Sequence, residues 1–336
     1  MPTNQTFQSL ITDRLPSWTP RLGFTVLLLT FGEFVAWHQS STYSLLDWLA
    51  VATIYLALTM ITLDLIARFQ IHDWIGILLI GGIFGIAHSA LISLTFYHNI
   101  PINIVLHATG LQTLMFMLTY AAFQFLYTNT IPPQPLFIIT PILGLGYGIS
   151  LKWLPHLDSI NLPVPELGAA LPYTIIALIA SALIIFIMRL PAEIKRFDWM
   201  LLPMEWVFSG GVIFVTALLR FNGGYIDSPF AFTIALVILA MILLLLWFIH
   251  STQPKQKIEW GIKLAPHQQT IIYWVTMFLP FALAAWLGYQ LPGDGKYSLQ
   301  GTLLFGALIA FGILWLPIVS TLISIRAFSE MGRQQY

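Results

Sequence analysis

The chain has 336 residues, of which 58% are hydrophobic and only 8% are charged, with a formal net charge of zero. A soluble domain carries about 25% charged residues, so this composition excludes a water-soluble globular protein and indicates an integral membrane protein. No basic stripe points to nucleic acid as a partner. The sequence contains no cysteine, which excludes disulfides, iron–sulfur clusters and thiolate metal sites.

Ten apolar runs are candidates for membrane-spanning helices. A bilayer core about 30 Å thick needs roughly 20 apolar residues per helix, whereas a β-barrel would show alternating segments of about ten. The sequence therefore predicts an all-α, polytopic protein with about ten transmembrane helices embedded in the lipid bilayer. The runs are 22–37, 44–67, 74–97, 102–127, 136–153, 168–189, 201–220, 230–250, 270–291 and 300–325.

The basic residues predict the orientation of these helices. If the first helix starts in the cytoplasm, 11 of the 14 Lys and Arg residues lie inside, and the exceptions are Lys152, Arg220 and Lys296. Basic residues favour the cytoplasmic side, so both termini are expected inside the cytoplasmic (inner) cell membrane. Residues 1–21 are polar, so a cleavable signal peptide is not expected.

The chain is expected to form one transmembrane domain, 22–325, between cytoplasmic segments 1–21 and 326–336. Its halves, 22–153 and 168–325, each hold five predicted helices, which is compatible with an inverted 5+5 repeat. The fifth and tenth helices both contain Gly and Pro, as interrupted helices at transporter sites do. Gly and Pro are also common in uninterrupted membrane helices, so the sequence leaves both interpretations open.

Two histidines lie inside predicted spans. His88 is near the middle of 74–97, and His107 is five residues into 102–127. An ionisable group in a bilayer must face protein or water, so each is either a neutral imidazole bonded between helices or a proton-relay or ligand-binding group. Their depths differ by about 6 Å at about 1.5 Å per residue, which disfavours paired haem ligation. Neither a metal nor a cofactor is predicted.

Two acidic residues lie near the predicted outer ends of the first two helices. Glu33 is close to the end of the first helix, and Asp47 starts the second, where a carboxylate typically caps the free N–H groups. His38 and His98 fall in the flanking outer loops. Together these groups are expected to form a polar path that descends to the two buried histidines.

Further charged residues lie near other predicted helix ends. Asp64 and Arg68 stand four residues apart and are expected to pair on one helix face. Glu205, at the start of the seventh helix, is either a paired carboxylate at the inner interface or part of an inner gate. Arg220 is either paired with Asp227 or is an outer ligand-reading group.

These features leave three functional classes. The first is a secondary transporter or permease for a small molecule or ion, with a site between helices in the outer half of the bundle. Because no nucleotide-binding motif occurs, any energy coupling would use an ion gradient or a partner subunit. The candidate ligand- or ion-binding residues are Glu33, Asp47, His88, His107, Glu205 and Arg220. The second class is a non-catalytic subunit that binds other membrane subunits. The third is an intramembrane enzyme acting on a lipid or isoprenoid, for which no catalytic residues are predicted.

Overall fold

The computed structural model is all-helical, and the part of the chain that it describes forms ten helical rods. The described residues are 7–36, 44–71, 73–93, 100–128, 132–153, 165–189, 199–224, 229–252, 268–292 and 298–334. Among them, nine helices are long and apolar enough to cross a membrane. The prediction of a multi-pass helical membrane protein is therefore confirmed.

The rods follow the ten predicted apolar runs. In chain order they are α1 with η1 (Phe7–Leu29, Thr30–Ala36), α2 (Leu45–Arg68), α3 (Trp74–Leu91), η2 with α4 and η3 (Ile104–Gln112, Thr113–Phe123, Gln124–Thr128), α5 (Pro133–Trp153), α6 (Leu167–Arg189), α7 (Pro203–Asn222), α8 (Pro229–Thr252), α9 with α10 (Gln268–Thr276, Phe278–Gln290) and α11 (Leu299–Gln334). The three η elements are π-helical. The first rod is not among the nine candidate spans, and α11 continues through most of the predicted C-terminal tail.

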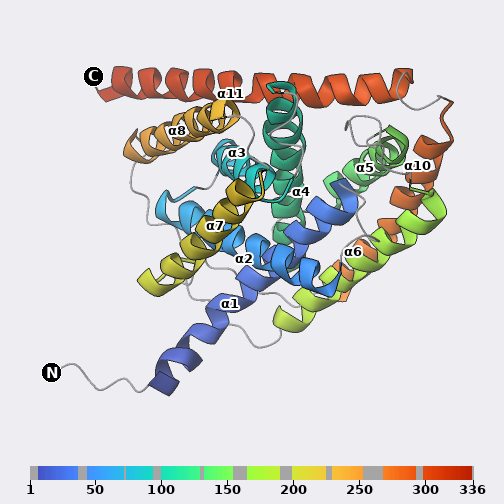
Figure 1. The fold of residues 1–336 in the computed structure, drawn as a ribbon, viewed down its shortest axis with the longest axis horizontal. Coiled ribbons are helices and arrows are strands. Elements are labelled where there is room, and N and C mark those ends of the chain that lie inside the picture. Colours follow the sequence, from blue (N-terminus) through green and yellow to red (C-terminus); the bar gives the residue numbers. More distant parts are fainter. Residues whose placement is uncertain are drawn as a thin grey trace.

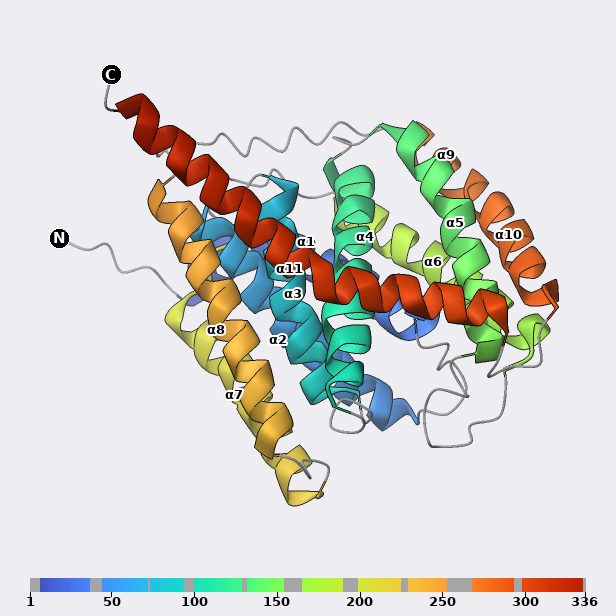
Figure 2. The ribbon, with the colours of Figure 1, turned by 90° about the horizontal axis from the view of Figure 1, so that it is seen from above.

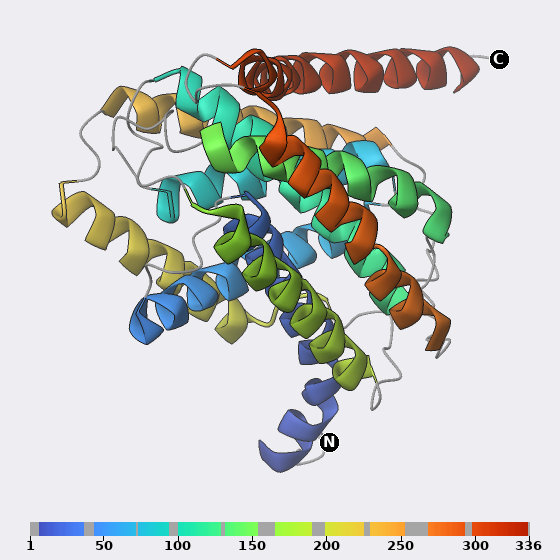
Figure 3. The ribbon, with the colours of Figure 1, turned by 90° about the vertical axis from the view of Figure 1, so that its right-hand side faces the viewer.

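The later part of the first rod lies inside the bundle, whereas the start of α1 projects from it (Figure 1). Helix α1 contacts α2, α4 and α6. On one side of it α7 and α8 pack on α2 and α3, and on the other side α10 contacts both α5 and α6. The last helix, α11, crosses one face of the bundle and contacts α8, η2 and α5 (Figures 2 and 3). It therefore connects the two sides.

The outer faces of the bundle are apolar. On α7, for example, Phe214 is 63% exposed and Leu219 is 66% exposed. Such a surface is unfavourable in water but suits the hydrocarbon of a bilayer, where backbone polar groups are satisfied within each helix.

Local sequence explains where several helices begin. Asp73 caps α3 by accepting a hydrogen bond from the Gly76 N–H at 2.9 Å. Ser44 caps α2, and Asp47 completes a capping box by accepting from the Ser44 N–H, also at 2.9 Å. Pro203 begins α7, at a position where the missing N–H costs no helical hydrogen bond.

The fifth and tenth rods are not interrupted, although both contain Gly and Pro. Helix α5 is continuous around Pro141, and α11 is continuous around Pro317. The interruption instead falls at Met277, between α9 and α10. Pro280 lies three residues later and has no N–H to donate to the carbonyl of Thr276, the last residue of α9. The inverted repeat remains a prediction.

The glycines of α5 allow close packing against α10. A methyl group on Gly144 would overlap the Phe281 carbonyl, and one on Gly148 would overlap the Ala285 carbonyl. Across the interface, a methyl group on Gly288 would overlap the α5 backbone in the same way. Small residues at such contacts let two backbones approach, which is how membrane helices gain packing energy.

We expect Gly148→Ala to lower the free energy of unfolding by about 1–3 kcal/mol, because the added methyl forces α5 and α10 apart. The matched control is Gly210→Ala on α7, where an added methyl would meet no atom within 4 Å. This control should be neutral or slightly stabilising. Thermal unfolding of the purified variants in detergent measures both, and equal effects would contradict the packing role.

Candidate functional site

A buried polar cluster joins Glu33 of η1, Tyr55 of α2 and His88 of α3. The Tyr55 hydroxyl donates to Glu33 Oε1 at 2.9 Å and lies 2.7 Å from His88 Nε2. Glu33 is 1% exposed, and the other two are fully buried. Because a hydroxyl has one hydrogen, its donation to Glu33 leaves the Tyr55 oxygen to accept from His88 Nε2–H. The three groups form one hydrogen-bonded chain across three helices.

Small residues and an aromatic ring enclose this cluster. A methyl group at Gly32 would overlap the Tyr55 hydroxyl, so only glycine lets the tyrosine reach η1. The Phe84 ring lies against His88, with their centroids 5.5 Å apart. One helical turn before the histidine, Gly85 packs against the backbone of η2. These contacts hold the cluster between helices.

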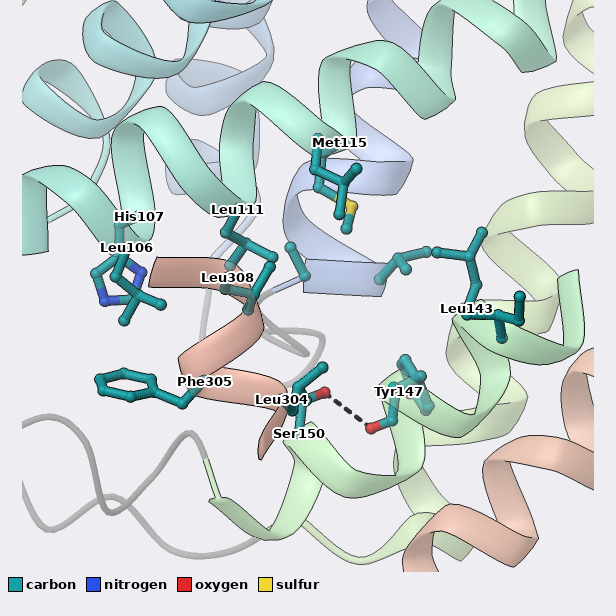
Figure 4. Close-up of a pocket in the computed structure, with 15 residues that line it drawn as sticks. Leu106, His107, Leu111, Met115, Leu143, Tyr147, Ser150, Leu304, Phe305 and Leu308 are labelled. Carbon is teal, nitrogen blue, oxygen red and sulfur yellow. Dashed lines mark hydrogen bonds between the residues drawn. The ribbon is translucent and has the colours of Figure 1, made fainter. Parts of the chain in front are cut away.

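A separate cavity of about 170 Å³ lies between η1, the η2–α4 rod, α5 and α11. Figure 4 shows His107 and Phe305 at one end of its lining, with Ser150 on the α5 side. Neither Glu33 nor His88 belongs to this lining. The structure thus places His107 at the cavity and the other two residues in the enclosed cluster, so the expected polar path does not run through one common space.

Two of the residues singled out from the sequence sit in π-helical segments. Glu33 lies in η1 and His107 lies in η2, and these two segments contact each other. Where η2 ends, the hydroxyl of Thr113, the first residue of α4, donates to the Ala108 carbonyl, five residues earlier, at 3.0 Å. π-Helical segments are rare and occur often at functional sites, so both segments mark this region of the bundle.

Sequence reasoning missed Tyr55 and the π-helical turns. A buried tyrosine hydroxyl normally finds a hydrogen-bond partner, so a tyrosine in the middle of the apolar run 44–67 was a usable signal. The π turns left no comparable signal, because i→i+5 bonding requires no particular residue type.

Glu205 pairs with an arginine from the first helix. Arg21 Nη1 lies 2.7 Å from Glu205 Oε1, and the arginine side chain is fully buried. The second carboxylate oxygen accepts the Leu202 N–H, which caps α7. Lys195 and Arg196, the nearest basic residues in sequence, lie outside the described residues. The carboxylate therefore fastens α1 to the start of α7.

Asp64 makes a second connection on the same side of the bundle. It pairs with Arg68 of the same helix, as predicted, and it accepts a hydrogen bond from the Leu201 N–H at 2.6 Å. Asp64 is fully buried. Together with Arg21 and Glu205, it ties α1 and α2 to the residues that precede α7.

Asp47 lies at an exposed helix start, where its carboxylate caps α2. The carboxylate accepts hydrogen bonds from the N–H and the hydroxyl of Ser44, the N-cap residue. His38 and His98, which were expected beside it, lie outside the described residues. Asp47 is thus placed as a cap at the end of the helix.

Arg220, near the end of α7, holds the end of α3. Its Nε donates to the Leu91 carbonyl at 2.9 Å, and its Nη2 donates to the Ile92 carbonyl at 2.8 Å. A cation at the last carbonyls of a helix satisfies free acceptors and complements the helix dipole. Asp227, the partner predicted from sequence, lies outside the described residues.

The enclosed cluster has the groups needed to bind and pass a proton. A carboxylate, a phenol and an imidazole each accept or donate one. Glu33 and His88 are also metal-ligating residue types, but no group of three His, Cys, Asp or Glu residues suited to a metal comes together in the described part of the chain.

We expect Tyr55→Phe to lower the free energy of unfolding by about 1–3 kcal/mol, because Glu33 and His88 stay buried without their shared hydroxyl. Denaturant unfolding in detergent, followed by tryptophan fluorescence, measures the change. The control is Tyr173→Phe on α6, which is 54% exposed and should change stability by less than about 0.5 kcal/mol. Equal losses in both variants would show that the bridging hydroxyl contributes nothing.

We expect Glu205→Ala to cost about 3 kcal/mol, because it leaves the buried Arg21 guanidinium without its ion partner. The double variant Arg21→Met/Glu205→Met should recover part of that loss, since an apolar pair needs no charge compensation. The same unfolding assay on the wild type, Arg21→Met, Glu205→Met and the double variant forms a double-mutant cycle that gives the coupling energy. A coupling energy near zero would mean that the two side chains do not depend on each other.

No protein-family model, curated protein or solved structure matches the chain. The assignment as a membrane protein therefore depends on the nine long apolar helices and the apolar outer faces among the described residues. By that geometry the chain is a multi-pass helical membrane protein, with an enclosed carboxylate–phenol–imidazole cluster beside a largely apolar cavity.

Proposed function

We propose that the protein is a proton-coupled secondary transporter for a small molecule, with its substrate site in the cavity at His107. The observation that carries this proposal is the dual position of η1. This π-helical segment supplies Glu33 to the enclosed cluster, and it supplies Val35 and Ala36 to the cavity wall. A change in proton occupancy of the cluster therefore acts on a segment that also touches the bound substrate.

The energetic basis is the burial of Glu33. A charged group in the membrane interior costs at least about 2.5–3.5 kcal/mol unless it is paired, so the cluster strongly prefers arrangements that match its charge. His88 Nε2 lies 3.7 Å from the Glu33 carboxylate. A protonated His88 therefore balances the negative charge of Glu33. Loss or gain of one proton breaks this balance and favours a different packing of η1, α2 and α3.

The π-helical turns supply a route for such a change. Conversion of i→i+5 bonding to ordinary i→i+4 bonding would rotate the side chains on one side of a helix relative to the other. In η2 that rotation would move His107 and Leu111, both of which line the cavity. In this proposal the protein lies in the cytoplasmic membrane with both termini inside, as the basic residues predict.

The test uses the full-length protein in liposomes that contain a pH-sensitive dye. A panel of small organic compounds is added singly, and proton movement is recorded together with compound uptake. We expect at least one compound to move protons in the wild type. Glu33→Gln should reduce that movement to the rate of empty liposomes, because the amide cannot take up and release the proton.

The matched control is Asp47→Asn, which changes an exposed carboxylate at a helix start and should leave coupled movement unchanged. The proposal fails if no compound moves with protons, or if the two variants behave alike. Copurification of stoichiometric partner chains in mild detergent would instead favour the non-catalytic subunit.

A further inference from the structure

The cavity at His107 is small. Its volume of about 170 Å³ lies below the roughly 300–1,000 Å³ of sites that enclose drug-sized ligands. It is close to the roughly 150 Å³ of an engineered apolar cavity in another protein that binds benzene. The cavity therefore has room for one aromatic ring with a short substituent, whereas a lipid chain could place only its end there.

The lining of this cavity is almost entirely apolar. None of its residues is Lys, Arg, Asp or Glu, and its polar side chains are those of His107, Tyr147 and Ser150. The Tyr147 hydroxyl lies 2.9 Å from Thr174 Oγ1, and Ser150 donates to the Tyr147 carbonyl at 2.8 Å, as Figure 4 shows. His107 is 1% exposed, and both of its ring nitrogens have almost no accessible surface. A charged ligand would leave water without a countercharge in the lining, which is costly.

Two side chains of the lining favour an aromatic ligand over an aliphatic one. Phe305 of α11 stands at one end of the cavity, and Met115 of α4 lies along it (Figure 4). Aromatic rings attract each other in offset or edge-to-face arrangements, and a thioether makes favourable contacts with a ring. A rigid ring also loses less conformational freedom on binding than the end of a flexible chain does. An aromatic ring is therefore favoured over the end of an acyl chain.

The cavity borders the side of the bundle that faces lipid. Ile142 of α5 lines it and is 65% exposed, so this wall meets the hydrocarbon of the bilayer. Uncharged aromatic molecules concentrate in that hydrocarbon because their transfer out of water is favourable. The bilayer is thus the source from which such a ligand reaches the cavity.

From these features we infer that the ligand of this cavity is a single uncharged aromatic ring with short apolar substituents, such as an alkylbenzene, taken up from the bilayer. Charged compounds and compounds of several fused rings are excluded as ligands of this cavity. The inference rests on the proposed function only for the assumption that this cavity is the substrate site, and it names the class of substrate.

The test is photolabelling of the full-length protein in phospholipid nanodiscs with phenyldiazirine, a single aromatic ring that carries a small photoreactive group. We expect saturable labelling within 106–115, 142–150 and 304–308, which supply most of the lining. Toluene should displace this label. Pyrene, whose fused rings exceed the cavity, and dodecane, a flexible chain, should not displace it, although both partition into the bilayer.

Gly146→Leu should reduce the saturable labelling about tenfold or more, because the added side chain occupies the cavity. Its first side-chain carbon fits, because the nearest atom, Leu304 Cδ1, is 3.9 Å away. The matched control is Gly306→Leu on α11, which lies outside the lining and where an added methyl would meet no atom within 4 Å. Labelling of this control should equal that of the wild type.

A second pair of competitors tests the preference for an aromatic ring. In the wild type, toluene should compete about two- to tenfold better than methylcyclohexane, which has a similar size but no π-system. Phe305→Leu should reduce this preference, because it removes the ring while keeping an apolar wall. Equal competition by the two compounds in the wild type would contradict the aromatic class.

Other results would overturn the inference as a whole. Labelling that toluene does not displace, or that is unchanged in Gly146→Leu, would mean ordinary lipid contact. Displacement by dodecane as effective as by toluene would assign the cavity to the end of a lipid chain. Because binding is measured without an ion gradient, saturable labelling without proton-coupled uptake refutes only the carrier. Coupled uptake of a charged or larger compound without saturable labelling refutes only the ligand class.

Discussion

The first rod carries two ionisable side chains, Arg21 and Glu33, into the centre of an apolar bundle, and the rest of the structure depends on how they are matched. Arg21 is fully buried against Glu205, and Glu33 is held by Tyr55 beside His88. An unmatched charge at either place would cost several kcal/mol. These partners come from α7, α2 and α3, so charge matching selects the neighbours of the first rod more specifically than apolar contact can.

The first rod packs through aromatic side chains such as Phe24 against Phe116 and Phe123, whereas two other helix interfaces rely on small residues. Between helices in lipid there is no hydrophobic driving force, and close van der Waals contact replaces it. Gly85 against η2 and Gly148 against α10 both bring two backbones together. Where large side chains meet, as between α4, α5 and α11, space is left over, and that space is the cavity at His107. The closely packed glycine interfaces therefore lie beside the loosely packed region that forms the cavity at His107.

Hydropathy and end signals predicted the rods well because both act locally. An apolar run of about 20 residues has one stable state in lipid, and a cap such as Asp73 acts within one turn. The Asp64–Arg68 pair was predictable for the same reason. The partners of Glu205 and Arg220 were not, because each comes from more than 120 residues away in the chain. Proximity across helices depends on which rods touch, and a single sequence does not encode that in any short pattern.

Only two of the three residues of the enclosed cluster could be predicted from the sequence, for a related reason. Glu33 and His88 stand out because ionisable residues in a span are rare, whereas Tyr55 looks like any aromatic residue of an apolar helix until its hydroxyl is located. Likewise, the glycines and prolines of α5 and α11 left open whether these helices are interrupted, and both are continuous. In both cases the residue type shows what a side chain can do, such as form a hydrogen bond or interrupt a helix. Only the contacts in the structure show whether it does so.

Arg21 and Glu33 of the first rod are mechanically linked under the proposed function. Arg21 and Glu33 are twelve residues apart, about 18 Å along a helix at about 1.5 Å per residue, and both are fixed to other rods. Moving a two-state equilibrium from 1:99 to 99:1 takes about 5.5 kcal/mol. An exposed ion pair contributes at most about 1 kcal/mol, which is too little for this shift. The free-energy cost of an uncompensated buried charge at Glu33 is large enough. A proton at the cluster can therefore shift the rod only if the Arg21–Glu205 pair is weaker than that penalty, so the strength of this pair sets the limit on coupling.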